Sequence, residues 1–288
     1  MLWIVFAVAG AIFEAAYYTL LKQQGDGVDP YILASGTFLI AAAMLLPASA
    51  VREFPDLGSG FLPAALIAAT INILAAALYF RVLRRTDLSL TIPMISFTPA
   101  FLIVTSYVIL GETPSTIGVA GILCTVAGSY VLNATSKSIE EPLDPIRRIA
   151  HTNGIRSMLI VAFLFSISLS YEKVVLLNSD PYFGVGIIFL MTGSALLAAS
   201  LARGGGPVRT VRRHSRLFLL LGAALALSAI STNLAFSLQI ASYVIAVKRL
   251  SVLFTAMYGV VILGEGHSWA RTLGSIVMVA GAASAALW

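Results

Sequence analysis

Runs of apolar residues, each long enough to cross a lipid bilayer, constrain the fold of this chain more than any other feature of its sequence. A hydrocarbon core about 30 Å thick requires roughly 20 residues of α-helix. We therefore predict an all-α integral membrane protein with ten transmembrane helices, over Leu2–Leu21, Tyr31–Val51, Phe61–Leu83, Leu88–Leu110, Thr116–Leu132, Arg156–Leu177, Tyr182–Ala202, Leu217–Leu238, Ile240–Leu263 and Ala270–Trp288.

The composition agrees with this prediction. Of 288 residues, 59% are hydrophobic and 11% are charged, whereas soluble domains carry about 25% charged residues. So few charges cannot make the surface of a soluble domain of this size wettable. The net charge of +5 comes from short clusters between the apolar runs rather than from one basic stripe, so we predict no nucleic-acid partner.

One division between the helices is less obvious than the others. A single helix over Leu217–Leu263 would be about 70 Å long, more than two hydrocarbon thicknesses, so we place a turn near Gln239–Ser242. The stretch 135–155, with several charges and two prolines, is predicted to be a polar linker.

The two halves of the sequence repeat each other. A shift of 151 residues, changing to 153 further along, aligns residues throughout both halves. The aligned pairs are Lys22 with Lys173, Asp29-Pro-Tyr31 with Asp180-Pro-Tyr182, Ile109-Leu-Gly-Glu112 with Ile262-Leu-Gly-Glu265, Ser115 with Ser268, Gly121 with Gly274, and Val126-Ala-Gly128 with Val279-Ala-Gly281. Because each copy has an odd number of helices, the second must enter the membrane from the opposite side. We therefore predict inverted five-helix repeats over residues 1–134 and 156–288.

The sequence around these signatures resembles the drug/metabolite transporter superfamily, specifically its ten-helix EamA-type members. The most specific marks are Leu110-Gly-Glu112 and Leu263-Gly-Glu265, each closing the fourth helix of a repeat and followed by a glycine-bearing fifth helix. The resemblance implies a secondary transporter that works by alternating access, with its substrate bound near the midplane between the repeats.

The basic residues predict an orientation in the cell membrane. The even-numbered connections hold only Arg52 and Lys173. The odd-numbered connections hold Lys22, Arg81, Arg84, Arg85, Lys137, Arg147, Arg148, Arg156, Arg203, Arg209, Arg212, Arg213, Arg216 and Arg271. By the positive-inside rule the odd connections are cytoplasmic, which predicts a multi-pass protein with both termini outside.

Ionisable side chains inside the apolar runs are candidates for function, because they are costly to place in lipid. Glu14 lies in the middle of the first run, with Tyr17 and Tyr18 three and four residues later on one predicted polar face. Lys248 and Arg249 lie together in the middle of the ninth run. The secondary candidates are Asn72, Tyr79 and Asn233.

Two further resemblances bear on these charges. The surroundings of Glu14 resemble the first helix of small multidrug resistance proteins, which implies a carboxylate that binds protons or cations; the second repeat has Phe165 at the matching position. Lys248-Arg249 looks like the phosphate-binding pair of plastid sugar-phosphate translocators, which implies an anion site. The alternative for both is a buried ion pair between Glu14 and Lys248 or Arg249 that fixes helix packing.

Other motifs predict structure rather than chemistry. Pro93 and Pro99 remove backbone hydrogen bonds from the fourth run and predict a kink near Ser96 and Thr98. Glu112 is predicted to have a role in the fold. The histidines show no metal-ligand spacing and no nucleotide-binding loop occurs, so we predict no metal and no cofactor.

The leading functional hypothesis is a proton-coupled secondary transporter that exports an amino acid or a related small metabolite, with the lipid bilayer and protons as its other partners. An exchanger of phosphorylated or other anionic metabolites is the alternative, and it would depend little on a proton gradient. A lipid flippase is a further alternative. An enzyme would need a converging acid, base or nucleophile near the interface, and the sequence shows no such group beyond Glu14, Lys248 and Arg249.

Overall fold

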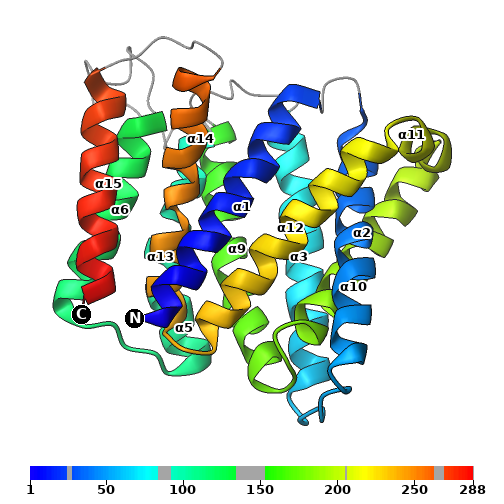
Figure 1. Cartoon of the computed structure of the whole chain (residues 1–288), viewed down its shortest axis with the longest axis horizontal. Helices are drawn as coiled ribbons and strands as arrows, with labels where there is room; N and C mark the ends of the chain where they lie inside the picture. The colour runs from blue at the N-terminus through cyan, green and yellow to red at the C-terminus, as the bar shows by residue number, and fades with distance from the viewer. Residues whose placement is uncertain (25–27, 84–91, 134–152, 205, 263–268, 288) are drawn as a thin grey trace. The chain divides into compact units, whose positions relative to one another are not determined.

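The computed structural model describes the chain as helices and turns over residues 1–24, 28–83, 92–133, 153–204, 206–262 and 269–287 (Figure 1). The helices of these residues are α1 (Leu2–Gln24), α2 (Pro30–Val51), α3 (Phe61–Leu83), the 3₁₀-helix η1 (Ile92–Phe97), α5 (Thr98–Leu110), α6 (Thr116–Asn133), α9 (Asn153–Leu177), α10 (Phe183–Ala202), α11 (Pro207–Arg213), α12 (Ser215–Phe236), α13 (Ala241–Lys248), α14 (Leu250–Val261) and α15 (Trp269–Leu287).

Within the described residues, seven helical segments are long and apolar enough to cross a membrane. They are Leu2–Gln23, Pro30–Val51, Phe61–Val82, Gly154–Leu177, Phe183–Ala202, Ser215–Phe236 and Ala241–Val261. Three shorter apolar helical segments are Met94–Leu110, Thr116–Leu132 and Arg271–Leu287. The prediction of an all-α, multi-pass membrane protein is therefore confirmed, while the full count of ten crossings stays a prediction.

The predicted turn between the eighth and ninth runs is present, since α12 ends at Phe236 and α13 begins at Ala241. The ninth run forms one apolar helical segment over Ala241–Val261, within which the regular α-helical hydrogen bonding is interrupted at a single residue, Arg249. Its hydrogen-bonded α-helix ends at Lys248 and resumes at Leu250, with Arg249 between α13 and α14. A 3₁₀-helix, η1, likewise precedes α5 where the fourth run was predicted to kink. The predicted linker 135–155 lies almost wholly outside the described residues.

Local sequence explains where several helices begin and end. Asp29 caps α2, because its Oδ1 accepts hydrogen bonds from the backbone N–H groups of Tyr31 (2.9 Å) and Ile32 (3.3 Å), while Pro30 fits the first helical position. The signature glycine Gly111 ends α5 in a left-handed conformation, with φ of 71°. This conformation suits a glycine and lets the backbone N–H of Gly111 bond to Tyr107.

The helices form two compact units, and each unit combines the two halves of the sequence. The first unit comprises residues 1–73 and 171–238, and the second comprises residues 74–170 and 239–288. Helices α3 and α9 therefore contribute one part to each unit, whereas α1, α2, α10 and α12 belong to the first unit and α5, α6, α13 and α15 to the second.

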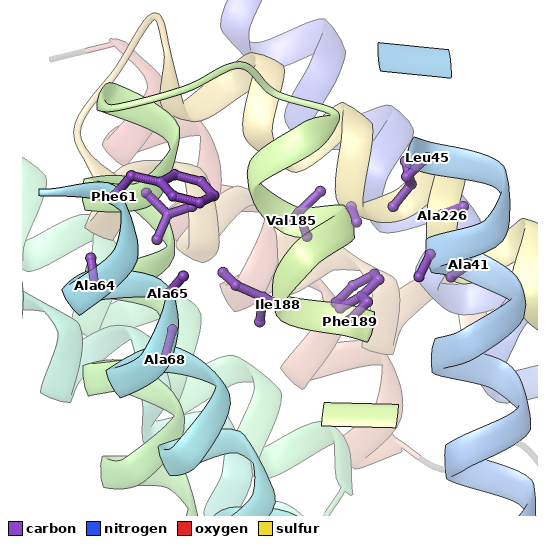
Figure 2. Close-up of a cluster of buried hydrophobic side chains, with 13 residues drawn as sticks. Ala41, Leu45, Phe61, Ala64, Ala65, Ala68, Val185, Ile188, Phe189 and Ala226 are labelled. Atoms are coloured by element: carbon purple, nitrogen blue, oxygen red, sulfur yellow. The ribbon is translucent and has the colours of Figure 1, made fainter. Parts of the chain in front are cut away.

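The core of the first unit is built on small side chains (Figure 2). Alanines line the buried face of α3, and larger side chains of α10 lie opposite them; the labelled residues are Ala64, Ala65 and Ala68 of α3 and Val185, Ile188 and Phe189 of α10. Hydrophobicity alone drives little association inside lipid, so the packing of side chains in this cluster must help to hold its helices together. The core of the second unit is formed by Val82, Met94, Ile155, Met158 and Val161.

Candidate functional site

The candidates on α1 differ in exposure, although the rings of Tyr17 and Tyr18 are in edge-to-face contact with their centroids 5.5 Å apart. Glu14 is partly buried. Tyr17 packs against an apolar cluster that includes Ile32 and Phe218, whereas 39% of the Tyr18 side chain is exposed. Because adjacent residues diverge by about 100° around a helix, one tyrosine turns inward and the other outward. Glu14 therefore has Tyr17 on the packed side of α1 and Tyr18 on the exposed side.

Asn233, a secondary candidate, meets a carboxylate that we did not single out from the sequence. The buried amide Nδ2 of Asn233 on α12 donates a hydrogen bond to Oε1 of Glu172 on α9, at 2.7 Å. The same nitrogen donates to the backbone oxygen of Ala229, at 3.0 Å. A buried amide that bonds a carboxylate in this way ties α9 to α12 by a charge-assisted hydrogen bond.

Lys173, the residue after Glu172, corrects the loop assignment used for the orientation. We counted Lys173 in the connection after the sixth run, but it lies within α9 and is only 6% exposed. Its ammonium nitrogen is 5.9 Å from the centroid of the Phe236 ring, a cation–π distance. The sequence could have shown this, because Glu172 and Lys173 both lie inside the predicted helix Arg156–Leu177. They precede its last residue by one to one and a half turns.

Asn72 and Tyr79 both lie on α3 but belong to different units. Asn72 is partly buried in the first unit. Tyr79, in the second, packs against the apolar cluster that contains Met94 and Met158. Its ring centroid is 5.9 Å from that of Phe80. These surroundings make Tyr79 in part a packing residue.

Lys248 and Arg249 stand at the interruption between α13 and α14 in the second unit. Both side chains are partly buried. The Nε of Arg249 is shielded from solvent and has no hydrogen-bond partner among the described residues. The backbone of Arg249 stays in the helical region, with φ of −60° and ψ of −13°, so the interruption is a local change in hydrogen bonding rather than an unwound segment.

A second interruption lies at the matching place in the first half of the sequence. The 153-residue shift pairs Thr98, the first residue of α5, with Ser251, one residue after α14 begins. Pro99 occupies the first turn of α5, and Pro93 lies in η1. The hydroxyl of Thr98 donates to Ile95 O at 2.7 Å, and the Ser96 and Ser129 hydroxyls are bonded at 2.7 Å. Both hydroxyl groups near the predicted kink therefore have protein partners.

The signature glutamate Glu112 contacts the start of α13. Its Oε2 accepts a hydrogen bond from the backbone N–H of Ala241 at 2.7 Å. Nearby, the Tyr243 hydroxyl accepts from the Ser115 backbone N–H at 2.8 Å. A carboxylate at a helix N-terminus satisfies a free N–H and interacts favourably with the helix dipole. This geometry fits the role in the fold predicted for Glu112; its counterpart Glu265 lies outside the described residues.

No group of three or more metal-ligating side chains occurs within the part of the chain that the structure describes. The candidate functional groups are ionisable side chains inside apolar helices. They are Glu14 and the Glu172–Asn233 pair in the first unit, and Lys248 and Arg249 in the second.

The helices described above are those of a multi-pass membrane protein, and comparison with known proteins gives a family match for its first half. Residues 1–134 match the EamA-like transporter family of the drug/metabolite transporter superfamily, as the signature Leu110-Gly-Glu112 indicated. This family consists of transporters, not enzymes.

A structural comparison covers the rest of the chain. A protein of known crystal structure, described only as a protein, is similar with a TM-score of 0.79 at 16% sequence identity. The similarity covers 99% of this chain and 97% of that one, and at this identity it concerns the fold alone. No curated protein matches the chain.

Proposed function

We propose that this transporter is a secondary carrier that works by alternating access, built from inverted repeats over residues 1–134 and 156–288. The observation that carries the proposal is that helices paired by the sequence repeat pack against each other antiparallel and with reciprocal contacts. This occurs once in each unit, between α6 and α15 in the second and between α2 and α10 in the first.

Helices α6 and α15 lie side by side (Figure 1), and their contact is reciprocal about four glycines. A methyl group added at Gly121 would lie 2.8 Å from the carbonyl oxygen of Gly281, and one added at Gly128 would lie 2.7 Å from that of Gly274. The 153-residue shift pairs Gly121 with Gly274 and Gly128 with Gly281. Each repeat therefore contributes the same two glycines to one antiparallel contact, which supports a two-fold relation in the membrane plane.

The contact between α2 and α10 repeats the pattern with polar side chains. The Arg52 guanidinium lies over the Tyr182 ring at 5.0 Å, and the guanidinium of Arg203 lies over the Tyr31 ring at 3.8 Å. The 151-residue shift pairs Arg52 with Arg203 and Tyr31 with Tyr182. Each arginine thus reaches the tyrosine of the other repeat, at opposite ends of α2 and α10.

An inverted pair of repeats suits transport because rocking of one repeat against the other exposes a midplane site to either side. The ionisable side chains Glu14, Lys248 and Arg249 within apolar helical segments support this mechanism, because such groups tend to mark transport pathways. The substrate we propose is a small metabolite such as an amino acid, exported in exchange for protons that bind Glu14.

Exchange of phosphorylated or other anionic metabolites is the second candidate function. It is favoured by the Nε of Arg249 beside Lys248, which is shielded from solvent and has no hydrogen-bond partner among the described residues. A guanidinium binds carboxylate and phosphate groups through paired hydrogen bonds.

The distribution of basic residues supports the same orientation for either function. By the positive-inside rule both termini lie outside, and the arginines of residues 203–216 lie on the cytoplasmic side.

Flux measurements in reconstituted vesicles test these functions. Wild-type protein, Glu14→Gln and Lys248→Ala would be compared for proton-gradient-driven flux of amino acids and sugar phosphates. A proton-coupled carrier should lose gradient-driven flux in Glu14→Gln while substrate binding persists. Anion exchange would be favoured if the flux does not depend on the proton gradient, is inhibited by inorganic phosphate and is lost in Lys248→Ala. Unchanged coupling in Glu14→Gln would rule out that role for Glu14.

A further inference from the structure

The first unit contains a second membrane carboxylate, Glu172, which the proposed function does not use. Glu172 lies in α9, within the apolar segment Gly154–Leu177. Ionisable groups in such segments are costly to keep and therefore tend to mark transport pathways. Its Oε1 is held at 2.7 Å by the amide of Asn233, which is itself 1% exposed. The carboxylate is thus fixed in place by a buried partner.

The position of Glu172 in the repeat gives it a counterpart in the first half. Phe165 occupies the place in α9 that matches Glu14 of α1. Glu172 follows Phe165 by seven residues, and seven residues of α-helix return to within about 20° of the same face. Both repeats therefore carry an acid on the matching face of their first helix, with the second acid two turns nearer the C-terminal end.

The two adjacent charges differ in accessibility. Lys173 is 6% exposed, with its ammonium group near the Phe236 ring, whereas Glu172 is partly exposed. A molecule that reaches this place therefore meets the carboxylate before the ammonium. Because a carboxylate accepts hydrogen bonds and attracts positive charge, the matching ligand is a cation with N–H donors.

The pair lies toward one end of the first unit. Glu172 is about 8 Å from the end of α9 at Leu177, and Asn233 is about 5 Å from the end of α12 at Phe236. The opposite end of α10 and α12 carries exposed arginines, Arg203, Arg209, Arg212, Arg213 and Arg216. A cation approaching the pair from its nearer end avoids that basic surface.

From these observations we propose that Glu172 binds the ammonium group of a transported amine or amino acid, and that Asn233 is the residue that positions its carboxylate. This inference rests on the proposed carrier function and names the charge that its substrate carries. The neighbouring Lys173 carries the opposite charge, so the two residues together have no net charge when no ligand is bound.

Uptake by reconstituted vesicles tests the proposal with a radiolabelled mixture of the common amino acids as the probe. Leucinamide keeps a free ammonium group and should compete, whereas N-acetylleucine lacks it and should not. Glu172→Gln keeps an oxygen acceptor for Asn233, so packing should survive. We expect this variant to lose about tenfold or more of uptake, since one charge-assisted hydrogen bond accounts for that factor. Glu53→Gln is the matched control, because it neutralises an exposed carboxylate outside the membrane segments; it should keep wild-type uptake and competition by leucinamide.

Asn233→Leu separates positioning from simple packing. Loss of the amide should raise the concentration of leucinamide needed for half-inhibition while maximal uptake changes less. Wild-type uptake in Glu172→Gln, with leucinamide still competing, would overturn the proposal and leave the carrier function standing. If the wild type takes up no label, the amino-acid carrier function fails. In that case the thermal stability of the protein with leucinamide tests the proposed ammonium site. Stabilisation of the wild type that is lost in Glu172→Gln would support the site, and no stabilisation of the wild type would overturn it.

Discussion

Glycine backbones touch along the middle of α6 and α15, whereas polar side chains join α2 and α10 at their two ends. The glycine contact leaves no space for adjustment, because any side chain added there would meet backbone atoms. The polar contacts depend on side chains that can change partners. Glycines of α10 also approach α2 closely, Gly186 at Leu46 and Gly193 at Leu39, so we expect adjustment between α2 and α10 only at the polar contacts of their ends.

The two ends of the α2–α10 contact also differ from each other. At one end the Ser49 hydroxyl donates to Oδ2 of Asp180 at 2.7 Å. At the other end the repeat-equivalent hydroxyl of Ser200 is buried and has no hydrogen-bond partner among the described residues. Ser49 and Ser200 are equivalent in the sequence repeat but differ in hydrogen bonding. Four sets of variants test the comparison of the two helix pairs and of the two ends of the α2–α10 contact.

The largest effect is expected in the glycine contact. Gly128→Ala would place a methyl group 2.5 Å from the backbone nitrogen of Met278, so the helices must separate. We expect a loss of about 1–3 kcal/mol of stability, the usual cost of overpacking. Thermal melting in detergent measures it. Gly206→Ala is the matched control, because nothing lies within 4 Å of its added methyl group; equal melting shifts would contradict a specific contact.

Removing the aspartates at the ends of the α2–α10 contact should have the next largest effect. Asp180 bonds the backbone N–H groups of Tyr182 (2.5 Å) and Phe183 (2.8 Å) as well as Ser49. Asp180→Ala should therefore cost about 2 kcal/mol, and Asp29→Ala about 1 kcal/mol for its cap. Denaturant titration followed by circular dichroism compares them, and a larger loss in Asp29→Ala would reverse the inferred asymmetry.

Variants of Ser49 and Ser200 test the difference between the two ends of the α2–α10 contact with one hydroxyl group at each end. Ser49→Ala loses a hydrogen bond to a carboxylate and should cost about 1 kcal/mol or more. Ser200→Ala removes a buried hydroxyl without a partner, so stability should stay the same or rise by a few tenths of a kcal/mol. The melting temperatures of the two variants, measured together, decide the matter: equal losses would mean that Ser200 is bonded in the native protein.

The smallest effect is expected for the arginines over the tyrosine rings. Arg203 is closer to its ring than Arg52, at 3.8 Å against 5.0 Å, although Arg52 also donates to the Tyr182 hydroxyl at 3.2 Å. Exposed cation–π contacts are worth about 0.5–1 kcal/mol, so Arg203→Gln and Arg52→Gln should each lower stability by no more than that. A double-mutant cycle with Tyr31→Leu tests the first contact, where additive losses would show that Arg203 and Tyr31 are not coupled.

Much of the fold could be predicted from the sequence, because a helix that crosses a bilayer must have about 20 predominantly apolar residues. The apolar runs, the turn before Ala241 and the EamA-type signature in residues 1–134 all follow from that rule or from local motifs. The capping role of Asp29 is equally local, since its partners are two and three residues away. The interruption at Arg249 was not predicted, because no proline marks it.

The candidate site was predictable only in part. Sequence reasoning singled out Glu14, Lys248, Arg249 and Asn233 as candidates, because polar residues stand out in apolar runs, and their roles stay predictions. It treated Lys173 as a loop residue and overlooked Glu172, since charges near the end of a run resemble the start of a connection. Only the packing of α9 against α12 shows that Glu172 meets a buried amide.

The sequence by itself thus determined the membrane environment, the helical class and the internal repeat, all of which depend on composition and spacing along the chain. The tertiary structure decided which repeated residues touch: Gly121 with Gly281, Arg203 with Tyr31, and Glu172 with Asn233. The physical reason is that each of these contacts joins residues more than 60 positions apart. Their distance depends on how helices cross, and that is set by the side chains of all the neighbouring helices together.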